Sequence, residues 1–190
     1  NGKKIDDVTQ LPIVRMQGGT YVFDAPAENS AVVVEGADAF VSDDPDALKP
    51  PDPHVGRVVD DPLALNGKAT HKGGAHYAWS GGFYLTGMTL DPGGRYAIRM
   101  RVRCDLAPGA QPDDVAFLAG VYSHTFKGAP CADTEIRVAQ VKDGYAWYEV
   151  KGTWTPAGNE TLWIGNGKRV NEVNPCVKAV YVDQVELFRK

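Results

Sequence analysis

Three arginines alternate along one strand-like segment of this 190-residue chain, and they are the residues best placed to bind an anionic ligand. Within residues 95–104, Arg99, Arg101 and Arg103 take every second position, between apolar residues. Because side chains of a strand point alternately to its two faces, we expect the three guanidinium groups on one face. Two interpretations stay open. Acidic residues on neighbouring strands pair with the arginines, or the arginines form a platform that binds carboxylate or sulfate groups in a bidentate manner.

Aromatic and histidine side chains form a second set with binding chemistry. Tyr122 and His124 share one face of the segment 115–125, Trp147 is out of phase with the apolar positions of its own segment, and Trp79 lies between glycine-rich turns. Flat aromatic rings suit the C–H faces of sugars, while arginine and histidine donate hydrogen bonds to hydroxyl groups. For each aromatic residue, a buried position in the core is the alternative.

One carboxylate stands in an otherwise apolar stretch near the end of the sequence. Asp183 lies within residues 178–188, between the apolar positions Val180, Val182, Val185 and Leu187. A carboxylate in such surroundings must be hydrogen-bonded, paired with a cation or bound to a metal ion. Asp183 is therefore a candidate metal ligand or structural ion-pair partner.

No segment carries a recognisable catalytic motif. The Gly-x-Ser-x-Gly nucleophile elbow is missing, and no neighbouring residue defines a partner for the histidines at 71, 76 and 124. Residues 43–46 are rich in aspartate but lack the glycine and closing glutamate of an EF-hand loop. A carboxylate pair of the glycosidase type is invisible in a sequence, because its members meet only in space. We therefore expect a non-catalytic protein, with a small hydrolase or lyase as the alternative.

Composition and net charge limit the classes of binding partner that the chain can have. The formal net charge is -4, which gives no electrostatic case for binding nucleic acid. No apolar run approaches the length of a membrane-spanning helix. No signal peptide is visible, and the chain opens at Asn1, so we expect that a targeting segment or an upstream domain has been removed.

The three cysteines match no zinc-binding pattern. Cys131 and Cys176 lie in turn-rich segments, where a disulfide between them is one interpretation. Cys104 ends the arginine-bearing segment, and there we expect a buried thiol. The odd number of cysteines leaves the redox compartment open.

Turn signals divide the chain into short strands. Residues 1–19 are a polar lead-in, and residues 20–190 form one domain with an Asp/Pro-rich loop at about 38–62. No amphipathic helix or internal repeat is evident. Roughly ten strands at fairly regular spacing predict an all-β sandwich of two antiparallel sheets.

Five segments, in the right order, resemble carbohydrate-binding modules with a galactose-binding-like jelly-roll fold, of the xylan- and glucan-binding type. Residues 147–156 (WYEVKGTWTP) resemble the family's W-x-x-V-x-G-T-F-T strand, and residues 180–187 (VYVDQVEL) its last strand, F-Y-I-D-D-V-x-L. Residues 90–96 (LDPGGRY), 66–69 (NGKA) and 22–24 (VFD) resemble its L-x-P-G-K-x-Y turn, its S-G-K-x-A turn and its opening N-F-E. The resemblance covers about residues 20–190.

The resemblance implies a structural calcium ion away from the sugar site. Its ligands would be Asp24, the carbonyl of Lys68 and Asp183, which are the oxygen donors that a hard cation prefers. Asp24 is shorter than the glutamate usual in the family, and Glu28 is the alternative ligand. Calcium would then tie the last strand to the first.

The resemblance also implies sugar binding across a sheet or in the loops at one end of the sandwich. We expect the strand 95–104 to be central in its sheet, with Tyr122, His124 and Trp147 on neighbouring strands and its arginines facing the ligand. The prediction is a secreted, non-catalytic module of a polysaccharide-degrading system, with an acidic polysaccharide as the ligand. The alternative is a structural or protein-interaction domain of the same fold that does not bind sugar.

Overall fold

The computed structural model describes the strand residues 13–14, 16–17, 20–21, 23–24, 31–35, 82–84 and 88–89, and the longer stretches 57–73, 93–123, 125, 127–128, 133–157, 160–165 and 174–190. Most of the predicted lead-in 1–19 and most of the Asp/Pro-rich loop lie outside these residues, as do Trp79, His124 and Cys131.

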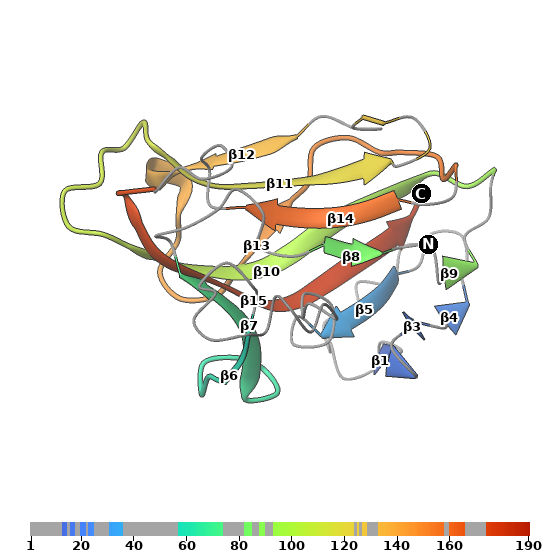
Figure 1. Ribbon diagram of the computed structural model, residues 1–190, viewed down its shortest axis with the longest axis horizontal. Coiled ribbons are helices and arrows are strands. Elements are labelled where there is room, and N and C mark those ends of the chain that lie inside the picture. The colour runs from blue at the N-terminus through green and yellow to red at the C-terminus, as the bar shows by residue number, and fades with distance from the viewer. Residues whose placement is uncertain are drawn as a thin grey trace.

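Two sheets form the sandwich, as predicted (Figure 1). In the seven-stranded sheet the order is β1-β5-β15-β10-β13, with β7 also paired to β15 and β6 to β7. Its strands are β1 (Ile13–Val14), β5 (Ala31–Glu35), β6 (Arg57–Asp60), β7 (Lys68–Gly73), β10 (Tyr96–Leu106), β13 (Ala146–Glu149) and β15 (Val177–Arg189). All its pairings are antiparallel except that of β1 with β5.

The four-stranded sheet is antiparallel, with the order β12-β11-β14-β8. Its strands are β8 (Gly82–Tyr84), β11 (Val115–Ser123), β12 (Thr134–Arg137) and β14 (Glu160–Gly165). Two further pairs join β2 (Met16–Gln17) to β3 (Thr20–Tyr21) and β4 (Phe23–Asp24) to β9 (Met88–Thr89). A short 3-10 turn, Val138–Gln140, follows β12. Within the described part of the chain, no helix is long and apolar enough to cross a membrane.

The core lies between the two sheets, and β10 shows why the chain folds this way. Its residues alternate between buried and half-buried, and the buried set is the predicted one: Tyr96, Ile98, Met100, Val102 and Cys104. Opposite them pack buried side chains of the other sheet, such as Phe117 and Leu162. Fully burying one large apolar side chain contributes about 1.5–3 kcal/mol. This alternation leaves the other face of β10 to the arginines.

The longest strand, β15, joins most of the larger sheet because it pairs with β10, β5 and β7. Its register against β10 shifts by one residue: Val182 pairs with Val102, but Gln184 pairs with Arg101. Asp183 is the extra residue of this β-bulge, which keeps the apolar positions on both sides of it directed to the core. The bulge explains how a buried carboxylate fits into an apolar strand.

Candidate functional site: the arginine face of the larger sheet

The outer face of β10, β13 and β15 carries the arginine ladder and is called the arginine face here. The side chains of Arg99, Arg101 and Arg103 retain 35%, 18% and 16% of their exposure, so only Arg99 is substantially open to solvent. All three point away from the core, as the period-two pattern predicts.

Each arginine is paired with a carboxylate of the same face. Arg99 Nε donates to Glu186, and Arg101 Nη1 donates to Asp183; both acceptors lie on β15. Arg103 donates to Asp61 at 2.8 Å and to both oxygens of Asp105 at 2.6 and 2.8 Å. The pairs of Arg99 and Arg101 with β15 confirm cross-strand pairing, the first of the two interpretations, whereas Arg103 pairs with Asp105 of its own strand and with Asp61 in the turn after β6. Four carboxylates pair with the three guanidinium groups, so these ion pairs leave no surplus of positive charge.

Arg103 is the centre of a nearly buried polar cluster. Its partner Asp61, 4% exposed, also accepts from the Tyr145 hydroxyl at 2.7 Å and from the Leu63 amide at 3.0 Å. The Arg103 guanidinium lies 3.6 Å from the centroid of the Tyr181 ring, a close cation–π contact. The Arg103 Nη groups, the Asp61 carboxylate and the Tyr145 hydroxyl are all paired within the protein, whereas the buried Arg103 Nε has no hydrogen-bond partner among the described residues. The paired groups stabilise the fold.

The electrostatics of the cluster follow from these contacts. Burial raises the pKa of Asp61, but the hydrogen bonds from Arg103, Tyr145 and the Leu63 amide outweigh burial and hold that pKa below its usual value. Burial and the hydrogen bond to Asp61 raise the pKa of Tyr145. Tyr145 therefore stays a neutral donor and Asp61 an ionised acceptor at neutral pH.

Arg99 differs from the other two because its guanidinium lies between two aromatic rings. The ring centroids of Trp147 and Phe188 are 4.6 and 4.9 Å from its Cζ. Among the described residues, the donation from Nε to Glu186 is the one hydrogen bond of this side chain. Its two Nη groups are therefore oriented by the rings and available to a ligand.

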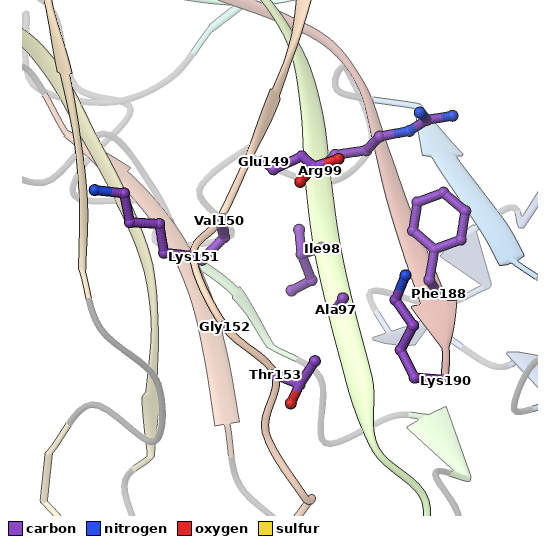
Figure 2. A pocket seen from close by; sticks show the side chains of 10 residues that line it. All are labelled: Ala97, Ile98, Arg99, Glu149, Val150, Lys151, Gly152, Thr153, Phe188 and Lys190. Carbon is purple, nitrogen blue, oxygen red and sulfur yellow. The ribbon is translucent and has the colours of Figure 1, made fainter.

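A depression of about 580 Å³ opens beside Arg99 (Figure 2). It lies where β10, the end of β13 and the end of β15 meet, and its lining residues are Ala97, Ile98, Arg99, Glu149, Val150, Lys151, Gly152, Thr153, Phe188 and Lys190. Figure 2 shows Lys190 and the Phe188 ring on one side of β10, whereas Lys151 extends away from that strand. The Lys190 ammonium lies 5.5 Å from the Phe188 centroid, so two cations, Arg99 and Lys190, lie near this ring.

The structure brings some of the predicted sugar-binding residues together and separates another. Arg99, Arg101 and Trp147 share the arginine face, since Trp147 pairs with Arg101 across β13 and β10. Tyr122 lies in the other sheet, where it pairs with Thr161. Its predicted place on a strand neighbouring the arginines is wrong because β11 pairs with β12 and β14, not with β10. Trp79 and His124 are outside the described residues.

Around Tyr122, the four-stranded sheet has a tightly packed outer surface. A Cβ on Gly120 would lie 2.6 Å from Asp133 Oδ1 and 2.9 Å from the Trp163 ring. The absence of a side chain at Gly120 thus lets the indole and the carboxylate approach the strand. Trp163 is 9% exposed, and burial raises the pKa of Asp133.

Asp183 does not fit the calcium ligand set that the resemblance implies. Its carboxylate is fully buried and accepts from Arg101 and from the Leu65 amide, at 3.2 and 3.4 Å. Burial raises the pKa of Asp183, while the charge and hydrogen bond of Arg101 favour the ionised form. The implied ligand at Lys68 is its backbone carbonyl, and the side chain of Asp24 lies outside the described residues. No group of three metal-ligating side chains occurs among the described residues.

Two cysteines are described, and both are buried and outside any disulfide bond. This confirms the prediction for Cys104. The Cys176 sulfur lies 2.8 Å from Asn174 Oδ1 and 3.4 Å from the Val115 carbonyl oxygen, and its single proton can be donated to either acceptor. Cys176 therefore does not form the suggested disulfide with Cys131 in this structure.

The sequence pattern missed the residues that complete the arginine face. Glu186 and Phe188 occupy alternate positions of β15 that face outward. This alternation can be recognised in the sequence only when the bulge at Asp183 is taken into account. Lys190 follows β15 directly, and its backbone amide donates to the Arg95 carbonyl at 2.8 Å. Asp61 is far from Arg103 in the sequence, and no sequence pattern indicated that the two residues would pair.

Comparisons with known proteins give weak likenesses only. No family model and no curated protein matches the chain. Among solved structures, an arabinose-bound α-L-arabinofuranosidase aligns over 70% of this chain and 21% of its own, with 13% identity and a TM-score of 0.44.

Two further structures are similar at the same level. An insecticidal delta-endotoxin from Bacillus thuringiensis aligns over 66% of this chain and 20% of its own, with 16% identity and a TM-score of 0.43. The CBM22-1 xylan-binding domain from Paenibacillus barcinonensis aligns over 70% of this chain and 80% of its own, with 14% identity and a TM-score of 0.42. The chain spans about a fifth of the arabinofuranosidase and of the endotoxin. Likenesses at this level carry no information on ligand or activity.

Proposed function

We propose that this chain is a non-catalytic β-sandwich module that binds carbohydrate in the depression beside Arg99. The observation that carries the proposal is the geometry of Arg99, whose Nη groups are left available while Trp147 and Phe188 hold its guanidinium in place. Such a pre-oriented fork binds a carboxylate or a sulfate with two parallel hydrogen bonds. The volume of about 580 Å³ lies within the range of about 300–1,000 Å³ that small-ligand sites occupy.

The ligand class that fits best is an acidic saccharide. Phe188 adds apolar surface to the depression, and the Arg99 guanidinium and the Lys190 ammonium lie 4.9 and 5.5 Å from the centre of its ring. A uronate or a sulfated sugar bound there has its charge within reach of both cations. The resemblance of five sequence segments to carbohydrate-binding modules supports the same proposal. In this proposal the module belongs to a secreted polysaccharide-degrading system.

A glycan panel measured at low and at high salt tests this proposal. We expect uronate-containing or sulfated oligosaccharides to bind, and their affinity to fall as salt rises, because exposed charges are screened. Equal binding of neutral glycans with no effect of salt would contradict the acidic ligand. No binding to any glycan would leave the alternative, a structural or protein-interaction domain. Release of shortened products would show an enzyme instead.

Conservative substitutions can locate the binding site because they keep the positive charge at the substituted position. Arg99→Lys keeps a positive charge for Glu186 but removes the fork, so we expect affinity to fall roughly 10-fold or more, the loss of one charge-assisted hydrogen bond. Arg137→Lys is the matched control because Arg137 lies on β12 in the other sheet, in an exposed pair with Glu135. Unchanged affinity in Arg99→Lys, with both variants folded, would place the sugar elsewhere.

A further inference from the structure

The turn between β6 and β7 is held against β15 by direct contacts. The Leu65 amide, inside this turn, donates to both oxygens of Asp183 at 3.2 and 3.4 Å. Asp61, at the start of the turn, is held by Arg103 of β10 and by Tyr145. The turn that precedes Lys68 is thereby fastened to the strand that carries Asp183. These two segments are among those that the implied calcium would join.

The other partner of Asp183 is the Arg101 guanidinium, which occupies the position that a cation would need. Calcium binds oxygen ligands at about 2.3–2.6 Å, and Arg101 Nη1 is already hydrogen-bonded to Asp183 Oδ2. The β-bulge that turns Asp183 toward the arginine face makes this contact, because Arg101 stands across from the bulge.

The charges around this pair are already close to balance. The Asp183 carboxylate already has the Arg101 guanidinium as its counterion, so a divalent cation added beside this pair would leave an excess of positive charge there. Asp183 is fully buried and the Arg101 side chain is 18% exposed, so water does not screen that excess well.

We propose that Arg101 is the built-in counterion of Asp183 and replaces the calcium that the sequence resemblance implies. In this domain the turn 61–67 is attached to the last strand by the Arg101–Asp183 pair and the Leu65 amide. The fold then needs no divalent cation, whether or not the module binds sugar.

Metal content and thermal unfolding of the whole chain test the first half of the proposal. After incubation with calcium and removal of unbound ions by gel filtration, elemental analysis is expected to find no bound calcium. The melting temperature should be the same in chelator and in millimolar calcium, a concentration that fills even weak extracellular sites. A melting temperature that rises with calcium would overturn the proposal, because a cation bound only to the folded state stabilises it.

Substitutions of Arg101 test the second half. Arg101→Met keeps the aliphatic length but leaves Asp183 buried without a counterion, and its melting temperature should fall by roughly 6–20 °C. Arg137→Met is the matched control, since it removes an arginine from an exposed pair and should melt within about 1–4 °C of the original chain.

Arg101→Lys keeps a cation for Asp183, so it is expected to recover most of the loss. This variant also decides the case if Arg101→Met does not fold. An Arg101→Met protein as stable as the original chain would overturn the proposal. So would an Arg101→Lys protein that is as unstable as Arg101→Met, because a bare positive charge would then not be what Asp183 requires.

Discussion

Replacing Asp61 by alanine should destabilise this domain more than any exposed ion pair can. The carboxylate is 4% exposed and accepts three hydrogen bonds, from Arg103 at 2.8 Å, Tyr145 at 2.7 Å and the Leu63 amide at 3.0 Å. Breaking a buried pair costs about 3–5 kcal/mol. Because Arg103 keeps its two hydrogen bonds to Asp105, we expect the lower end, about 3 kcal/mol.

Chemical and thermal unfolding, followed by circular dichroism, measure this loss. For a domain of this size, about 3 kcal/mol corresponds to a fall in melting temperature of roughly 6–12 °C. Glu135→Ala is the control: its pair with Arg137 is 3.2 Å long with both side chains about half exposed, so about 0–1 kcal/mol is expected. Tyr145→Phe, which removes a single hydroxyl, should cost about 1 kcal/mol.

The reasoning is refuted if Asp61→Ala loses no more stability than Glu135→Ala. That result would mean that the buried cluster around Arg103 gains as little from its charges as a surface pair does. A double variant, Asp61→Ala with Tyr145→Phe, sharpens the test. Its loss should be smaller than the sum of the two single losses, because both substitutions break the same hydrogen bond.

Three further outcomes are expected. Gly120→Ala brings a Cβ within 3 Å of Asp133 Oδ1 and of the Trp163 ring, so unfolding measurements should show a loss of about 1–3 kcal/mol; an unchanged protein would mean that the indole moves at no cost. The pKa of Asp61 is lower in the folded state than in the unfolded chain, so its ionised carboxylate stabilises the fold fully above about pH 4. This stabilisation is lost as the pH falls through the folded-state pKa. A pH series of melting curves should therefore show a smaller acid-induced loss of stability in Asp61→Ala than in the original chain. Burial raises the pKa of the Cys104 thiol to about 12, so thiol reagents at mildly alkaline pH should label it only after unfolding, and mass spectrometry of labelled peptides checks this.

The two faces of β10 could be predicted from the sequence because burial follows the period of the pleat. The alternation in β10 gave the core positions and the outward arginines correctly. Trp147 was predicted to be outside the core from its phase, and it pairs with Arg101 on the arginine face. The alternation of apolar and polar residues is a local pattern, so the sequence of a single strand is enough to detect it.

Which strands become neighbours could not be predicted in the same way. Tyr122 has the right phase but lies in the other sheet, because the pairing of β11 with β14 depends on the whole chain. The pairing of Arg103 with Asp61 likewise joins residues 42 positions apart, and no local pattern encodes such a distance. The position of Asp183 in a bulge does leave a trace, since the apolar spacing lengthens from two to three residues between Val182 and Val185.

The position of β15 in the larger sheet also fixes when this sheet can assemble during synthesis. Gln184 pairs with Glu35, so one of the sheet's earliest strands finds its partner only after about 150 further residues have been made. Until β15 leaves the ribosome, the apolar face of β10 lacks its main neighbour and the arginines lack Asp183 and Glu186. The seven-stranded sheet can therefore be completed only after β15 has been synthesised. Such non-local pairing is typical of domains that fold on the millisecond-to-second timescale or more slowly.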